Sequence, residues 1–200
     1  MRLGHLHLSL EDKTGDSAIL EYVGGKLNIH HDRRYAIMTN EPPFEEQQEN
    51  LKAYEGFGGS RPLPGTDSPQ DRFVRAAYYI KNLPKPHDLR EALAYIFSVI
   101  RNVSAPYSIL VDPKHPNIHP TLWRAVADMT NGSYYFESTT SPYLIWVDLD
   151  ELDFKEGSPA LSLSLSDNPD LSGDVSKQFV EAGPFPYFVP ADLAGHIAEN

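Results

Sequence analysis

Asn40 ends a short apolar run over residues 35–39 and is followed by a Glu-Pro-Pro turn. An asparagine at the end of a strand can aim its side-chain NH2 group into a cleft, where it can stabilise an oxyanion. On its spacing alone, an asparagine in this position more often forms an Asx turn or caps a helix. Asn40 is therefore a candidate oxyanion donor, with a structural role as the alternative.

Arg72 lies in the first turn of a predicted helix, directly after Asp71. A cation in the first helical turn opposes the helix dipole, so this placement suggests an anionic partner. The alternative is a surface arginine paired with Asp71 or Asp67, an interaction that contributes little to stability.

Histidines form a second candidate group, because His5 and His7 are expected on one face of a strand, and His30 and His31 could join them as metal ligands. The alternative is a polar strand face that is exposed to solvent, which the alternation of these histidines with leucines favours. A metal-dependent hydrolase that uses His5, His7 and His30 is therefore a minor hypothesis.

The composition excludes several other chemistries. The chain has 200 residues, about one domain, and no cysteine, so it carries no disulfide, thiolate metal site or cysteine nucleophile. Its net charge of −11 argues against a nucleic acid and against an anionic membrane surface as partners. We recognise no signal peptide in these residues, and the sequence assigns no compartment.

The elements that must position Asn40 begin as strands. Leu6, Leu8 and Leu10 alternate with polar residues, the pattern of a strand with one buried face. Turn residues over 12–16 and 24–25 separate this strand from two more. The further strands are predicted over 17–23, 26–30 and 35–39, and the last of these is expected to be buried on both faces.

Helices follow. Residues 44–54 have a weak helical pattern. Ser68 and Pro69 form a strong helix start, and this helix is expected to end near Leu83. Asp88 caps the most amphipathic segment, in which apolar residues recur at intervals of three and four as far as Val103.

The last third returns to strands, and Asn131-Gly132 predicts a type I′ hairpin turn between the first two. From residue 167 the pattern fades, so residues 167–200 are expected to form a partly extended tail. The order of strands, helices and strands predicts an α+β fold with an antiparallel sheet and helices packed on it. These later strands are predicted over 121–128, 133–138, 143–148 and 160–166.

Several stretches of the sequence resemble the choloylglycine hydrolase and penicillin V acylase family of N-terminal nucleophile hydrolases. They are LHLSLEDKTGDSAILE from residue 6, MTNEPPF from residue 38, which holds Asn40, and DRFVRAA from residue 71, which holds Arg72. Residues 121–128 and 134–136 also look like the family's C-terminal strands. The order and content of these stretches carry the resemblance, because no single motif is decisive.

The resemblance implies part of an αββα sandwich and hydrolysis of a linear, non-peptide amide C–N bond. In the family, a cysteine at the mature N-terminus attacks the carbonyl with its own amino group as base. The residue that Asn40 matches helps to form the oxyanion hole, and the residue that Arg72 matches lies close to the nucleophile. No metal or organic cofactor is implied, and the small-molecule substrate stays open among penicillin V, bile salts and acyl-homoserine lactones.

The chain departs from the family because the half that would hold the cysteine nucleophile is absent from it. Residues 1–200 are therefore expected to be the C-terminal portion of a single N-terminal nucleophile hydrolase domain, inactive alone and cleaving a small-molecule amide as part of the full-length protein. A homo-oligomer and a complementing N-terminal half stay open as partners, and so does a periplasmic or secreted location. The alternative is a stand-alone module that binds a carboxylate ligand near Asn40 and Arg72.

Overall fold

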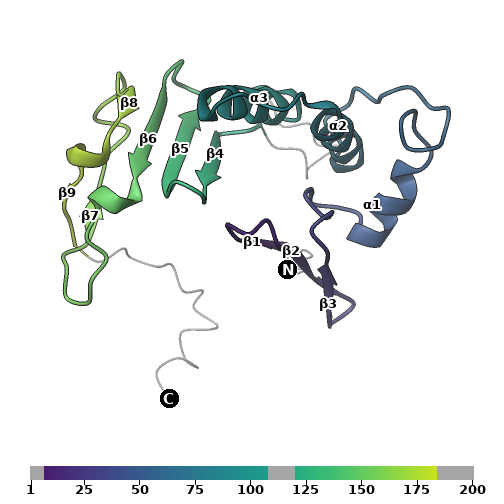
Figure 1. The fold of residues 1–200 in the computed structure, drawn as a ribbon, viewed down its shortest axis with the longest axis horizontal. Coiled ribbons are helices and arrows are strands. Elements are labelled where there is room, and N and C mark those ends of the chain that lie inside the picture. Colours follow the sequence, from purple (N-terminus) through teal and green to yellow (C-terminus); the bar gives the residue numbers. More distant parts are fainter. Residues whose placement is uncertain (1–6, 108–119, 184–200) are drawn as a thin grey trace.

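The computed structural model describes residues 7–107 and 120–183 (Figure 1). The chain runs from three strands through three helices to a second set of strands. The strands are β1 (His7–Glu11), β2 (Ser17–Val23), β3 (Lys26–His31), β4 (Trp123–Asp128), β5 (Ser133–Ser138), β6 (Leu144–Asp148), β7 (Leu161–Ser162), β8 (Gly173–Asp174) and β9 (Val180–Glu181). The helices are α1 (Phe44–Leu51), α2 (Pro69–Asn82) and α3 (Leu89–Asn102), with short 3-10 turns at Leu149–Glu151 and Ser176–Gln178.

The first sheet is antiparallel, in the order β1-β2-β3. Val23 pairs directly with Lys26, so only Gly24 and Gly25 form the turn between β2 and β3. Their φ angles of 59° and 79° suit a two-residue turn that requires the left-handed region at both positions. The first three predicted strands and both predicted turns are confirmed.

The predicted helix starts are also confirmed. The Ser68 hydroxyl accepts a hydrogen bond from Asp71 N at 3.3 Å, and Pro69 occupies the first helical position. The Asp88 carboxylate accepts one from Glu91 N at 2.8 Å. Each cap satisfies a backbone N–H group that has no partner within its own helix.

The second sheet has the order β4-β5-β6-β8, with one parallel pair between β6 and β8. The predicted hairpin between β4 and β5 exists. The prediction of a type I′ turn is wrong, because Asn131 does not have the positive φ that this turn requires. A four-residue loop joins the strands instead. The Asp128 carboxylate organises it by accepting hydrogen bonds from Thr130 N at 3.0 Å and Asn131 N at 3.1 Å.

Two predicted strands are not formed as expected. Residues 35–39 are not a strand and are only partly buried, because Tyr35, Ile37 and Met38 pack their side chains on the core instead of pairing along their backbone. The strand predicted over 160–166 is reduced to the two residues of β7. Residues 167–183 contain β8 and β9, and Val175, 2% exposed, is buried beside β6.

The core that positions the candidate site joins the first sheet to the helices. Ile19 of β2, Phe44 of α1 and Phe73 of α2 form one buried cluster. On the second sheet, Arg101 of α3 and Arg124 of β4 both bind the carboxylate of Glu137, the latter at 3.0 Å. Antiparallel sheets with helices packed on them confirm the predicted α+β class (Figure 1).

Candidate functional site

Asn40 and Arg72 are in direct contact. Arg72 Nη2 donates a hydrogen bond to Asn40 Oδ1 at 3.0 Å, and Arg72 Nε donates to the backbone oxygen of Asp67 at 3.1 Å. Since the amide oxygen of Asn40 faces Arg72, its NH2 group is directed elsewhere and keeps its two protons for another acceptor. The side chain of Asn40 is exposed.

The Arg72 guanidinium is partly withdrawn from water. Burial lowers the pKa of Arg72 below its usual value, the carboxylate of Asp67 opposes this shift, and the neighbouring cation of Arg75 adds to it. An arginine nevertheless stays protonated in a protein. Of the two alternative partners, the Asp71 carboxylate accepts hydrogen bonds from Thr66 instead, and Asp67 contacts Arg72 through its backbone oxygen.

Gln47 holds the two residues that flank Asn40. It is 1% exposed, and its Nε2 donates to Thr39 Oγ1 and to the backbone oxygen of Glu41, both at 2.8 Å. Sequence reasoning missed this residue. The signal was available, because Phe44, Gln47 and Leu51 share one face of α1, and a glutamine among apolar residues needs hydrogen-bond partners.

Glu21 anchors the start of the same helix. The residue before α1 is Pro43, which offers no side-chain cap. The carboxylate of Glu21 takes this role from β2, since both of its oxygens lie 3.0 Å from Phe44 N. Glu21 is 2% exposed, so β2, α1 and the turn that carries Asn40 are joined through one buried carboxylate.

His7 and His30 do not lie on the solvent-exposed face that the sequence predicts, whereas His31 is exposed and its Nε2 lies 3.0 Å from Asp16. His7 Nδ1 lies 2.8 Å from Glu21 and His30 Nε2 lies 3.2 Å from it, with the His7 and His30 side chains 8% and 12% exposed. That prediction is wrong because a buried carboxylate requires hydrogen-bond donors, and these two imidazoles supply them. His5 lies outside the described residues. Within the described parts of the chain, no cluster of acidic and histidine side chains is suited to a metal ion.

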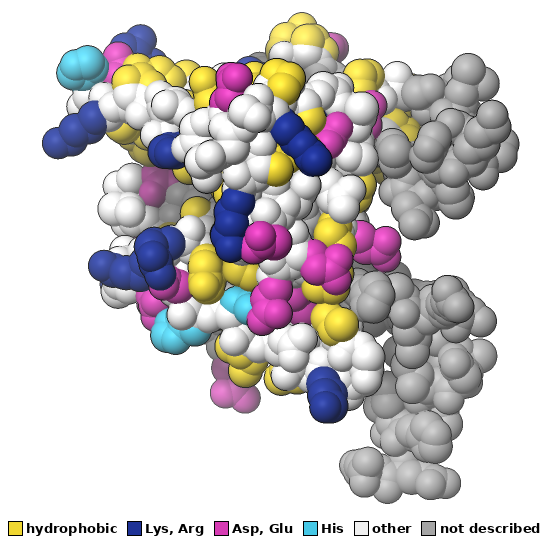
Figure 2. Space-filling view, turned by 90° about the vertical axis from the view of Figure 1, so that its right-hand side faces the viewer, with side chains coloured by type: hydrophobic (Ala, Val, Ile, Leu, Met, Phe, Trp, Pro, Cys, Tyr) yellow, Lys and Arg dark blue, Asp and Glu magenta, His cyan; other side chains and the backbone are white. Residues whose placement is uncertain are grey.

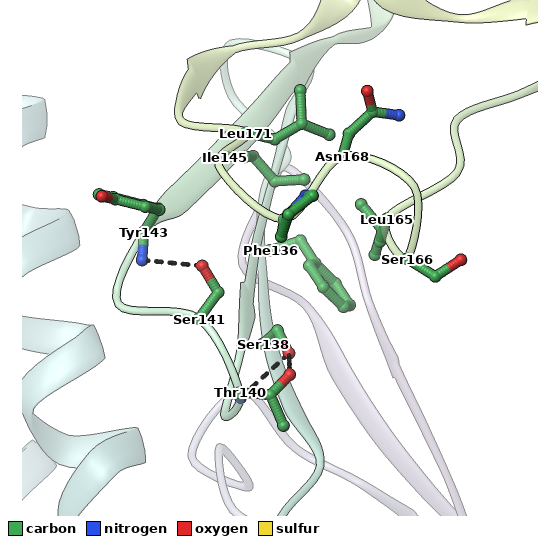
Figure 3. A pocket seen from close by; sticks show the side chains of 11 residues that line it. Phe136, Ser138, Thr140, Ser141, Tyr143, Ile145, Leu165, Ser166, Asn168 and Leu171 are labelled. Atoms are coloured by element: carbon green, nitrogen blue, oxygen red, sulfur yellow. Dashed lines mark hydrogen bonds between the residues drawn. The ribbon is translucent and has the colours of Figure 1, made fainter.

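A cavity of about 400 Å³ lies elsewhere, between β5, β6 and the segment 165–171 (Figure 3). Its polar groups largely bind one another: Ser138 Oγ pairs with Thr140 Oγ1 at 2.8 Å, and Tyr143 N donates to Ser141 Oγ at 3.2 Å. Neither Asn40 nor Arg72 lines it, so this cavity is not the candidate site.

Figure 2 shows acidic and basic side chains interspersed on the face of the molecule that carries α1, rather than a surface of one sign. Within residues 7–107 and 120–183, the helices are too short or too polar to traverse a bilayer.

Comparisons with known proteins agree with this fold and give the family of the chain. Residues 2–171 match the model of the linear amide C–N hydrolases, choloylglycine hydrolase family, and the chain belongs to this family. It is 44% identical, over 93% of its length, to a penicillin V acylase of Pectobacterium atrosepticum. The solved structure of penicillin V acylase from Agrobacterium tumefaciens is 43% identical and superimposes with a TM-score of 0.81 over 91% of the chain.

More distant relatives also match the chain in sequence. A conjugated bile acid hydrolase of Lactobacillus gasseri is 27% identical over 65% of the chain. The chain spans about half the length of its curated relatives, 53% of the Pectobacterium protein and 47% of the Lactobacillus protein, and 58% of the Agrobacterium structure.

Proposed function

We propose that this chain is the C-terminal portion of a single N-terminal nucleophile hydrolase domain that cleaves a linear, non-peptide amide bond in a small molecule. The observation that carries the proposal is the hydrogen bond from Arg72 to Asn40 Oδ1. This bond turns the Asn40 NH2 group away from Arg72 and leaves it available to another acceptor. A free amide donor beside a partly buried cation suits the stabilisation of developing negative charge.

Asn40 would act on the oxygen of the amide being cleaved. Attack on the carbonyl carbon forms a bond to the nucleophile and moves the C=O electron pair onto oxygen. The Asn40 NH2 group donates a hydrogen bond to this oxyanion. When the carbonyl re-forms, the C–N bond breaks and the leaving amine takes the proton that the nucleophile gave to its base. Water then cleaves the bond between the acyl group and the nucleophile and releases the acid. One such donor stabilises the transition state by about 3 kcal/mol.

Arg72 would serve two purposes. Its Nη2 group fixes the orientation of the Asn40 amide, and its positive charge favours an anion nearby. A cation close to a thiol lowers the pKa of the thiol, so Arg72 would also favour the thiolate form of a cysteine nucleophile. The chain has no cysteine, and the nucleophile must therefore come from outside these 200 residues.

The proposal predicts that the purified chain hydrolyses no amide, and that activity appears when a polypeptide supplies the missing nucleophile. Penicillin V is the first substrate to assay, because the relatives of 43% and 44% identity are penicillin V acylases. The test mixes the chain with a polypeptide covering the N-terminal half of the Pectobacterium acylase and measures release of the side-chain acid. Turnover by the chain alone would contradict the proposal, and so would equal activity of the Asn40→Ala variant in the mixture.

A further inference from the structure

Both faces of the β1-β2-β3 sheet carry apolar side chains, and the face toward α1 also holds buried polar groups. The face toward α1 carries Ile19 of the core cluster, the buried polar residues Ser17 and Glu21, and His7 and His30. The other face is mostly leucine and isoleucine, together with Tyr22 and His31. Antiparallel sheets with one solvated face turn their apolar residues inward and their polar residues to water. This sheet is therefore built to be covered on both faces.

The apolar side chains form one continuous surface, which we call the leucine face. Leu8 of β1 pairs with Leu20 of β2, and Leu20 pairs with Ile29 of β3, so an apolar row crosses all three strands. The exposed fractions of its outer members are high. They are 50% for Leu8, 49% for Leu10, 45% for Leu27 and 60% for Ile29.

The two edges of this sheet are also unpaired within the described residues. In the order β1-β2-β3 only β2 pairs on both sides, so β1 and β3 are edge strands within the described residues. Edge strands offer unpaired backbone groups to a further strand, and contiguous apolar patches mark interaction surfaces.

We propose that the leucine face is the docking surface for a polypeptide that supplies the part of the family fold not contained in these 200 residues. The match to the Pectobacterium acylase covers 93% of this chain but only 53% of the acylase, so almost half of that relative has no counterpart here. The proposal rests on the proposed function only for the identity of this partner. A second copy of the chain fits less well, since each copy has a net charge of −11 and copies repel one another.

The absence of cysteine from the chain gives a direct test. A single cysteine introduced by Ile29→Cys reports on the leucine face, and one introduced by Phe154→Cys is a matched control at a side chain that is 72% exposed. Each variant is treated with a maleimide alone and with the polypeptide covering the N-terminal half of the Pectobacterium acylase. We expect that polypeptide to slow labelling at position 29 at least tenfold and to leave labelling at position 154 unchanged.

Unchanged labelling at position 29 in the presence of the polypeptide would overturn the proposal. Slower labelling at position 29 as the chain's own concentration rises, without the polypeptide, would overturn it in favour of a second copy. Penicillin V hydrolysis by the Ile29→Cys variant, which retains Asn40, is measured in the same mixtures and separates this proposal from the proposed function. Protection without hydrolysis in every mixture would support docking while contradicting the hydrolase, and hydrolysis without protection would do the reverse.

Placing positive charges on the leucine face gives a second test. The double variant Leu8→Lys, Ile29→Lys places two cations on the leucine face, and Phe154→Lys is its control. We expect co-purification with the tagged polypeptide to fall at least tenfold for the double variant only. Because both substituted side chains are at least half exposed, circular dichroism should show the same secondary structure for all three proteins. Equal co-purification of the three would contradict the proposal.

Discussion

Arg72 Nη2 and Asn40 Oδ1 lie 3.0 Å apart although 32 residues separate them in the sequence. Each side chain is brought to this point by a different element. Arg72 is set by the first turn of α2, which Ser68 caps and Phe73 ties to the core. Asn40 is set by its neighbours, which Gln47 holds from α1. The contact therefore depends on how α1 and α2 pack together.

Removing the amide of Asn40 is expected to affect the rate rather than substrate binding. In the mixture that restores activity, Asn40→Ala should lower kcat about 100- to 1,000-fold and change KM little, because an oxyanion donor acts in the transition state. Steady-state hydrolysis of penicillin V measures both constants. Asn28→Ala, at an exposed position of β3, is the control and should keep wild-type values. A larger effect on KM than on kcat would argue for a substrate-binding role instead.

Gln47 is expected to stabilise the turn that carries Asn40. Gln47→Leu removes two hydrogen bonds and leaves the backbone oxygen of Glu41 without this donor, which should lower the free energy of unfolding by about 1–3 kcal/mol. Urea denaturation of the chain measures this change. Gln48→Leu, on the adjacent half-buried position of α1, is the control, for which we expect less than half of the effect. Equal losses for the two variants would mean that the contacts of Gln47 contribute nothing specific.

Substitution of Glu21 is expected to destabilise the fold more than substitution of any other polar residue of the first sheet. Glu21→Ala leaves His7, His30 and Phe44 N without their shared acceptor. Loss of one member of a buried charged group costs about 3–5 kcal/mol. Thermal unfolding should show a much lower Tm for this variant than for Glu55→Ala, an exposed control. A Tm within two or three degrees of wild type would show that the buried carboxylate is dispensable.

Local patterns were sufficient to predict several elements. The caps Ser68 and Asp88 bind backbone groups three residues away, so a short stretch of sequence contains both partners. The turn at Gly24 and Gly25 is similarly local, since its geometry depends on their own φ angles. The resemblance to the family singled out Asn40 and Arg72, and their contact follows from packing that no local pattern encodes.

The orientation of the first sheet could not be predicted in the same way. Alternation shows that Leu8 and His7 lie on opposite faces, but it does not say which face is turned toward α1. The face toward α1 holds Ile19, which packs in the core cluster, and Glu21, whose carboxylate binds His7, His30 and Phe44 N from three separate elements. Residues 35–39 were misjudged for a related reason: their apolar side chains pack on a core made by other segments, without a neighbouring strand.

The junction between α3 and the second sheet is expected to weaken in acid. Burial raises the pKa of Glu137, but the hydrogen bonds and positive charges of Arg101 and Arg124 outweigh this and hold the pKa below its usual value. Since the pKa is lower in the folded state, the stabilisation is fully present above the unfolded pKa of about 4.3 and is lost as the pH falls through the lowered folded value.

The variant Glu137→Gln tests this junction, because it removes the titrating group while preserving the size of the side chain. It should be less stable than wild type at pH 7, and its free energy of unfolding should fall less steeply between pH 5 and pH 3. Urea denaturation across that range measures both effects. Glu156→Gln, at an exposed position, should reproduce the wild-type slope. If Glu137→Gln also kept the wild-type slope, the acid sensitivity of the chain would have to come from carboxylates other than Glu137.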